Sequence, residues 1–185
     1  MPDRVDRALF VAGLVLFLGA LVLVFTFGAG NRTETRIDHS HWSMLAGSVF
    51  MLPFAVKLRR NLWAVAGSIM LTAGIVGVIG MCVIDLVFWG IADDALRDAV
   101  AAELVAIPSI WWPFMLYGPE EVLYSGMVLA SACYWRWTRA GTAFVTLGAI
   151  LAIAGPTWFN VAGAASVLLG FLIDFRAVKE VAEKA

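Results

Sequence analysis

Long apolar segments alternate with short charged turns along this chain, and the basic residues gather at every second turn. The apolar sequence divides into six segments, at residues 8–29, 42–57, 62–91, 109–135, 140–155 and 158–175. A helix needs about 20 predominantly apolar residues to cross the hydrocarbon core of a bilayer. Gly155-Pro156 separates the last two segments, because proline cannot continue a helix and glycine favours a turn. The pattern predicts an all-α, polytopic transmembrane bundle of about six spans, in one domain over residues 1–185.

Basic residues indicate the orientation of the segments. Only Arg32, Arg36 and Arg97, of thirteen Lys and Arg residues, fall at one set of segment ends. The other set of ends holds Arg4, Arg7, Lys57, Arg59, Arg60, Arg136, Arg139, Arg176, Lys179 and Lys184. Cytoplasmic loops carry an excess of Lys and Arg. The asymmetry predicts an integral protein of the plasma (inner) membrane with both termini cytoplasmic, and the net charge of -1 leaves no basic face for nucleic acid.

Two further patterns concern packing. In residues 93–105, apolar side chains recur at helical spacing after a capping Asp93 or Asp94, and Pro108 follows. We predict a short amphipathic helix on the outer surface, either a lid over the bundle or a cover for an exposed loop. Small residues let helix backbones approach closely in a membrane. Two glycine strips are therefore expected contact faces: Gly74, Gly77 and Gly80, and Gly141, Gly148 and Gly155.

Most ionisable residues in or beside the apolar segments fall toward the predicted outer face. The third segment runs outward and carries Asp85 in its outer third, and the fourth segment carries Glu120 and Glu121. The same outer zone holds Asp38, His39, His41 and Asn160. Ionisable groups inside a membrane are costly and face a cavity or a partner. We predict Asp85, Glu120 and Glu121 to be acid/base carboxyls of one outer site.

Helix-end roles are the alternative for several of these residues. Asp38 is a good N-cap candidate, and Pro119 followed by two acids is a usual way for a helix to begin. His39 and His41 face the same side only if the chain is extended. On a helix their directions diverge by about 200°.

The residue types of the outer zone fit three kinds of chemistry. A protonated carboxyl, a carboxylate and aromatic faces suit protonation and cyclisation of an isoprenoid-like lipid without a cofactor. The expected substrate contacts are Trp111, Trp112, Tyr117, Trp89 and Asn160, and the tryptophans equally fit an interfacial belt. A divalent metal held by His39, His41 and Asp38 is the second kind. The third is a proton relay through the same acids.

The stretch Gly118-Pro119-Glu120-Glu121-Val122-Leu123-Tyr124 resembles the proline–Glu-Glu–aromatic signature of the membrane-bound lycopene cyclase family, small multi-span proteins of carotenoid synthesis. This chain has one residue fewer between the proline and the acid pair. The resemblance implies a carotenoid-type isoprenoid cyclase with Glu120 and Glu121 as its acid/base carboxyls.

Two other resemblances give weaker support for a function. The sequence from Glu120 to Gly126 is similar to the first motif of the CAAX-type intramembrane proteases, but Ser125 replaces that family's Arg and no histidine follows position 41. His39-Ser40-His41 resembles the His-x-His sequence of some haem- and copper-associated membrane proteins. With two histidines in the chain, we do not expect a bis-histidine haem within one subunit.

The resulting prediction is an integral membrane enzyme that acts on an apolar, isoprenoid-like lipid through acid/base carboxyls. The alternatives are a non-enzymatic membrane subunit or small proton-linked transporter, and a metal site at His39 and His41. The expected partners are a membrane lipid or apolar small molecule, and a second copy or a partner subunit.

Overall fold

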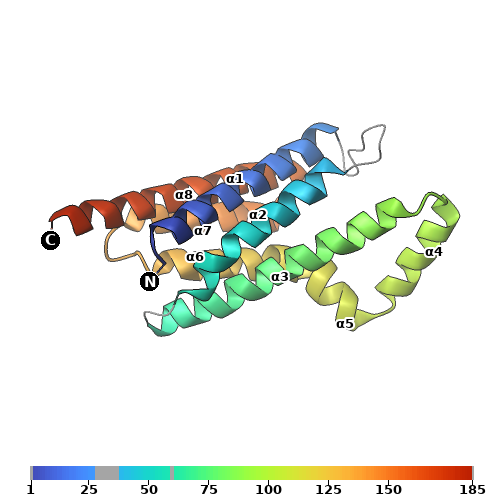
Figure 1. Ribbon diagram of the computed structural model, residues 1–185, viewed down its shortest axis with the longest axis horizontal. Coiled ribbons are helices and arrows are strands. Elements are labelled where there is room, and N and C mark those ends of the chain that lie inside the picture. Colours follow the sequence, from blue (N-terminus) through green and yellow to red (C-terminus); the bar gives the residue numbers. More distant parts are fainter. Residues whose placement is uncertain (1, 28–37, 59–60, 185) are drawn as a thin grey trace.

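The structure, a computed structural model, describes residues 2–27, 38–58 and 61–184. These residues form an all-α bundle whose long helices lie along one axis (Figure 1). In chain order the elements are α1 (Arg4–Phe27), α2 (His39–Val56), α3 (Leu62–Gly90), α4 (Asp94–Val105), α5 (Pro108–Trp111), the π-helical turns η1 (Trp112–Leu116) and η2 (Gly118–Val122), α6 (Leu123–Ala132), α7 (Arg139–Ala154) and α8 (Thr157–Lys184).

The all-α class is confirmed, but six membrane spans are not supported. Three helices are long and apolar enough to cross a bilayer: α1, α3 and residues Trp158–Glu180 of α8. A fourth is reached only if α4 and residues Pro108–Leu116, bent by 92° against each other, count as one broken span. The predicted segments at 42–57 and 140–155 fall short because α2 begins with the polar sequence His39-Ser40-His41 and α7 has only 16 residues. Residues 28–29 of the first predicted segment lie outside the described residues.

Apolar side chains remain on the outside of the bundle. At most 33% of the apolar window of each of the three long helices is buried, and Ile69 of α3 leaves 65% of its surface exposed. Soluble monomers rarely expose apolar patches of this extent. The outer surface is therefore that expected of a protein integral to a membrane.

The predicted fourth segment, 109–135, is not one continuous helix. Pro113 and Pro119 have no N–H to donate, and the chain here bonds with the π-helical spacing: Tyr117 N donates to Trp112 O and Val122 N to Tyr117 O, each at 2.9 Å. After the short helix α5, regular α-helix resumes only at Leu123. Glu120 and Glu121 therefore lie in a π-helical turn, a feature frequent at functional sites.

A helix is present at the predicted place, as α4, while its position on the outer membrane surface stays a prediction. Its N-cap is Asp93, whose side chain accepts a hydrogen bond from Leu96 N at 3.0 Å. No residue of α4 is buried, however, and Figure 1 shows α4 standing apart from the bundle, between the end of α3 and α5. The lid interpretation is therefore wrong, because α4 does not lie over the bundle.

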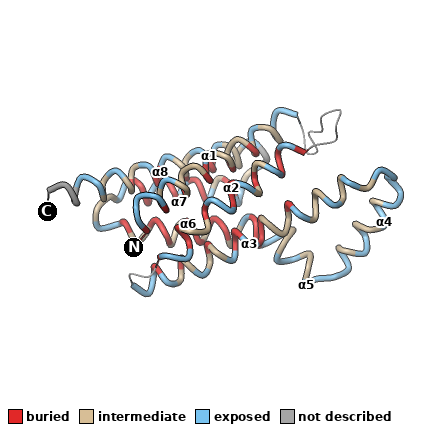
Figure 2. Tube along the Cα trace, in the orientation of Figure 1, coloured by how far each residue is buried: buried red, intermediate tan, exposed pale blue. Residues whose placement is uncertain are grey.

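The core forms where the remaining helices meet. Helix α1 packs beside α2, α7 beside α8, and α3 along η2 and α6. Figure 2 shows the buried residues on the faces that these helices turn toward one another. At one end the core is a cluster of aromatic rings, with Phe10 and Phe54 centroids 4.2 Å apart and Phe171 4.7 Å from Phe10.

Both predicted glycine strips lie at close helix contacts. A Cβ atom on Gly74 of α3 would overlap the Cα atom of Leu123. One on Gly148 of α7 would lie 2.5 Å from the carbonyl oxygen of Gly163 in α8. No side chain fits at these separations, so glycine is what allows the backbones to approach.

The ends that carry the basic residues meet at one end of the bundle. Lys57, after α2, pairs with Asp6 at the start of α1 at 2.6 Å, and Arg7 of α1 lies over the ring of Phe175 near the end of α8. Figure 1 shows both chain termini at this end. Arg32, Arg36, Arg59 and Arg60 lie outside the described residues. The cytoplasmic placement of this end stays a prediction.

Candidate functional site

The start of α2 carries a buried hydrogen-bonded turn. Asp38 is the N-cap, and its Oδ1 atom accepts from the His41 backbone N at 3.1 Å and from the Ser40 hydroxyl at 2.6 Å. Its other carboxylate oxygen, Oδ2, lies 2.5 Å from Nδ1 of the His41 ring. The side chain of Asp38 is 1% exposed. The predicted capping role of Asp38 is thus confirmed, and the cap also holds the orientation of an imidazole.

The second nitrogen of His41 reaches another helix. Nε2 of His41 lies 3.0 Å from Oδ2 of Asp85 on α3. The side chains are 10% and 21% exposed, so the contact is largely removed from solvent. A doubly protonated imidazole has an N–H on each nitrogen and satisfies both carboxylates at once. Asp38, His41 and Asp85 therefore form a carboxylate–imidazole–carboxylate array, named here the Asp–His–Asp array.

The surroundings favour the charged forms of His41 and Asp38. Burial lowers the pKa of His41, but hydrogen bonds with Asp85 and Asp38 outweigh it and hold that pKa above its usual value. Burial raises the pKa of Asp38, but hydrogen bonds from Ser40 and His41 outweigh it and the pKa is lowered. Both residues precede the apolar part of α2. The two carboxylates thus favour the protonated form of the imidazole.

A small cavity lies one helical turn below the array. Met44 follows His41 by three residues and Met81 precedes Asp85 by four, so each shares a helix face with a member of the array. The cavity has a volume of about 70 Å³ and is lined by Phe17, Leu21, Met44, Met81, Pro119, Glu120, Tyr124, Ala152 and Asn160. Of the predicted outer group, Glu120 and Asn160 therefore meet here.

One residue of the cavity lining has a buried polar atom without a hydrogen-bond partner in the described part of the chain, Oδ1 of Asn160. Oε2 of Glu121, which follows Glu120 in the chain, is buried in the same way. Buried polar atoms are nearly always paired with protein or with ordered water. The lining of the cavity is mostly apolar, and Glu120, Tyr124 and Asn160 are the polar residues in it.

Other predicted site residues lie elsewhere. His39 is exposed, on the opposite side of α2 from His41, as helical spacing requires. Within the described ranges no three His, Cys, Asp or Glu residues are grouped to hold a metal ion. Trp112 and Tyr117 are more than half exposed and line a separate groove. Trp89 and Trp111 are half-buried near α4 and α5, so the four aromatics do not line the Glu120 cavity.

One buried carboxyl was missed by the sequence reasoning. Asp174 on α8 is fully buried, and its Oδ2 accepts from the Ser131 hydroxyl at 2.6 Å. Its Oδ1 has no partner in the described part and lies against Gly141, where a Cβ atom would overlap it. Asp174 is the second-last residue of the predicted sixth segment, 158–175, and lies two residues before Arg176, so from the sequence it resembles an interfacial acid. Only the packing of α6, α7 and α8 buries it.

A comparison with known protein families, curated proteins and solved structures found no significant match to this chain. The resemblance of residues 118–124 to the lycopene cyclase signature therefore stays a prediction.

Proposed function

We propose that this chain is a small proton-linked membrane transporter, in which the Asp–His–Asp array binds and passes on the coupling proton. The observation that carries the proposal is the placement of the His41 ring between two carboxylates, Asp38 at its Nδ1 and Asp85 at its Nε2. Ionisable groups paired in this way inside membrane proteins commonly act as proton relays.

The array has the parts that a relay needs. An imidazole takes up a proton at one nitrogen and releases one from the other. Asp38 is held by three hydrogen bonds and positions the ring, so it acts as a positioning residue. Asp85 is the more exposed carboxylate and is the exchange partner of the proton on Nε2.

The cavity one helical turn from the array would continue this path toward Glu120 and Asn160, its polar residues. At about 70 Å³ it has room for about two water molecules. Pockets for organic ligands are usually about 300–1,000 Å³. This cavity is therefore too small for an isoprenoid.

Proton binding is tested by ¹⁵N-histidine NMR on the protein in micelles, because the chain has only two histidines. We expect His41 to hold its proton to a higher pH than a histidine in an unstructured peptide. Asp85→Asn should lower the midpoint of the His41 titration, because it removes the carboxylate at Nε2. A His41 midpoint at or below the peptide value in the unmodified protein would contradict the proposal.

Proton transfer is tested in liposomes with a trapped pH dye and an imposed membrane potential. We expect proton uptake in the unmodified protein, its loss in His41→Gln, and its retention in His39→Gln. The two substitutions make the same chemical change on neighbouring positions of one helix, so only the array distinguishes them. Uptake that survives His41→Gln rules out the relay.

A second function, an acid/base enzyme acting on an isoprenoid-like lipid, is favoured by the position of Glu121. Its Oε2 atom is buried without a hydrogen-bond partner among the described residues. Glu121 precedes Ser125 by one helical turn, and Ser125 lines an apolar groove of about 510 Å³ between α6 and α7. This groove is large enough for a lipid chain. Lipid extracts of expressing cells should then contain a new cyclic product that disappears with Glu121→Gln and persists with His41→Gln.

A further inference from the structure

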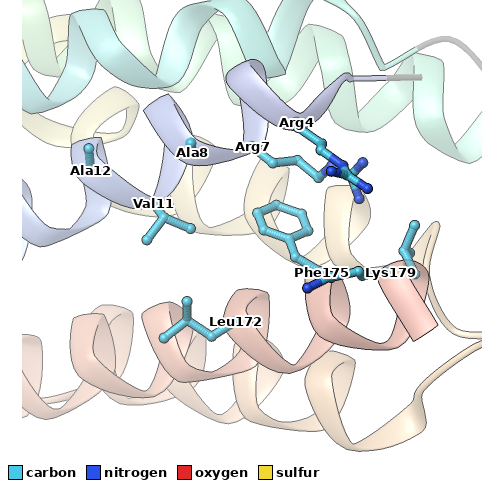
Figure 3. A pocket seen from close by; sticks show the side chains of 9 residues that line it. Arg4, Arg7, Ala8, Val11, Ala12, Leu172, Phe175 and Lys179 are labelled. Atoms are coloured by element: carbon cyan, nitrogen blue, oxygen red, sulfur yellow. The ribbon is translucent and has the colours of Figure 1, made fainter. Parts of the chain in front are cut away.

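A groove with both basic and apolar side chains lies between α1 and α8, at the opposite end of the bundle from the Asp–His–Asp array. The groove, of about 590 Å³, is lined by Arg4, Arg7, Ala8, Val11, Ala12, Leu172, Phe175, Val178 and Lys179. Figure 3 shows the side chains of Arg4, Arg7 and Lys179 gathered at one end of the groove, around Phe175. Val11 and Leu172 lie further along the same two helices, toward the middle of the bundle. The groove therefore has a cationic mouth and an apolar floor.

We infer that this groove binds one anionic phospholipid. Its phosphate lies among Arg4, Arg7 and Lys179, and one acyl chain lies along Val11 and Leu172. Basic pockets between transmembrane helices on the cytoplasmic side bind anionic headgroups, and guanidinium groups match phosphate oxygens in geometry and charge. The volume is in the usual range for an organic ligand. The inference is independent of the proposed proton relay, which lies at the other end of the bundle.

Two acids near the groove, among the described residues, pair with Lys57 instead of facing the groove. Asp6 is buried and points to Lys57, with Oδ1 2.6 Å from Nζ, and Asp3 also faces Lys57 at 3.8 Å. Neither lines the groove. Arg7 Nε donates to the backbone oxygen of Asp3 at 3.2 Å, and the guanidinium carbon lies 5.9 Å from the centre of the Phe175 ring. A guanidinium has five N–H donors, so Arg7 has further donors for a phosphate. Charge complementarity thus selects an anionic headgroup over a zwitterionic one.

The test is native mass spectrometry of the purified protein in detergent with added phosphatidylglycerol or phosphatidylcholine. We expect one phosphatidylglycerol to bind in preference to phosphatidylcholine. Each basic residue near an anionic phosphate strengthens binding about fivefold, so Arg4→Gln with Arg7→Gln and Lys179→Gln should weaken it at least tenfold. Arg176→Gln is the matched control. Arg176 lies within one helical turn of Lys179 on α8, but it pairs with Glu180 at 3.0 Å and does not line the groove.

A separate variant tests the apolar floor. Ala12→Trp fills the groove without a change of charge and should also release the lipid. Binding of inorganic phosphate or of soluble glycerophosphoglycerol as strong as that of the lipid would overturn the acyl-chain assignment. Equal binding of the two lipids would overturn the inference, and so would unchanged lipid binding by the triple variant. A lipid-free dimer that Ala12→Trp dissociates would also overturn it, because a second copy of the chain would then occupy the groove. If the triple variant does not fold, the exposed single change Arg4→Gln decides it, with about fivefold weaker binding expected.

Discussion

The substitution Asp38→Asn separates the two roles of this residue. Asn and Asp are comparable N-caps, so the side-chain oxygen that accepts from the His41 backbone N and from Ser40 is retained. What changes is the atom opposite Nδ1 of His41, where an uncharged amide group replaces a carboxylate oxygen at 2.5 Å. The substitution therefore removes the pairing of imidazolium and carboxylate and keeps the helix cap.

The structure sets the size of the effect. Hydrogen bonds to charged groups contribute about 1.5–3 kcal/mol, and the 1% exposure of the Asp38 side chain leaves little solvent to replace this one. We expect Asp38→Asn to lower the free energy of unfolding by about 2 kcal/mol. Asp38→Ala should cost about 1 kcal/mol more, because it also removes the cap. Asn61→Asp exchanges the same two residue types at the exposed N-cap of α3 and should change stability by less than about 0.5 kcal/mol.

The measurement is equilibrium unfolding in mixed micelles with increasing dodecyl sulfate, followed by helical circular dichroism. It is repeated at a pH above the raised pKa of His41, where the ring is neutral and the difference between Asp38→Asn and the unmodified protein should shrink. Equal stabilities for Asp38→Asn and Asn61→Asp at neutral pH would refute a charged pairing of His41 with Asp38.

Three further outcomes are expected from the same unfolding assay. Because the pKa of His41 is raised in the folded protein, its ionisation stabilises the fold below the unfolded pKa of about 6.5. This stabilisation is lost as the pH rises through the folded pKa, and His41→Gln should not show the loss. Gly148→Ala should cost about 1–3 kcal/mol by overpacking. Gly19→Ala meets no neighbouring atom within 4 Å of the new Cβ and should instead stabilise α1 by about 0.5–1 kcal/mol. Equal changes in stability for Gly148→Ala and Gly19→Ala would refute the close contact of α7 with α8 at Gly148. Ser131→Ala should cost about 1–3 kcal/mol because Asp174 loses its hydrogen-bond donor, and an unchanged midpoint would contradict that.

Local sequence patterns predicted the helices better than the crossings. Apolar runs and the Gly155-Pro156 break placed α7 and α8 to within a few residues at their starts, and Asp93 correctly capped α4. The number of spans was overestimated because an apolar run was equated with a crossing. The interruption after Pro108 shows why this fails: prolines and π-helical turns divide one apolar run into short pieces.

The candidate site was predicted in part. Placing Asp85 and the start of α2 toward the same face depended only on the antiparallel order of neighbouring segments, and the structure brings His41 and Asp85 together. Glu120 and Asn160 meet at the adjacent cavity for the same reason. The aromatic residues were misjudged, because Trp112 and Tyr117 belong to a stretch whose direction changes after α4.

The sequence alone determined the features that depend on chain-local chemistry: an apolar outer surface, basic residues at one set of helix ends, and caps where Asp, Asn or Thr precede a helix. Tertiary structure decided which polar atoms meet. Helical period orders residues around each axis but leaves the rotation and register between helices open, and those two quantities place His41 against Asp85 and leave His39 exposed. They also enclose Asp174 behind Gly141, although its sequence neighbours are those of an ordinary helix end.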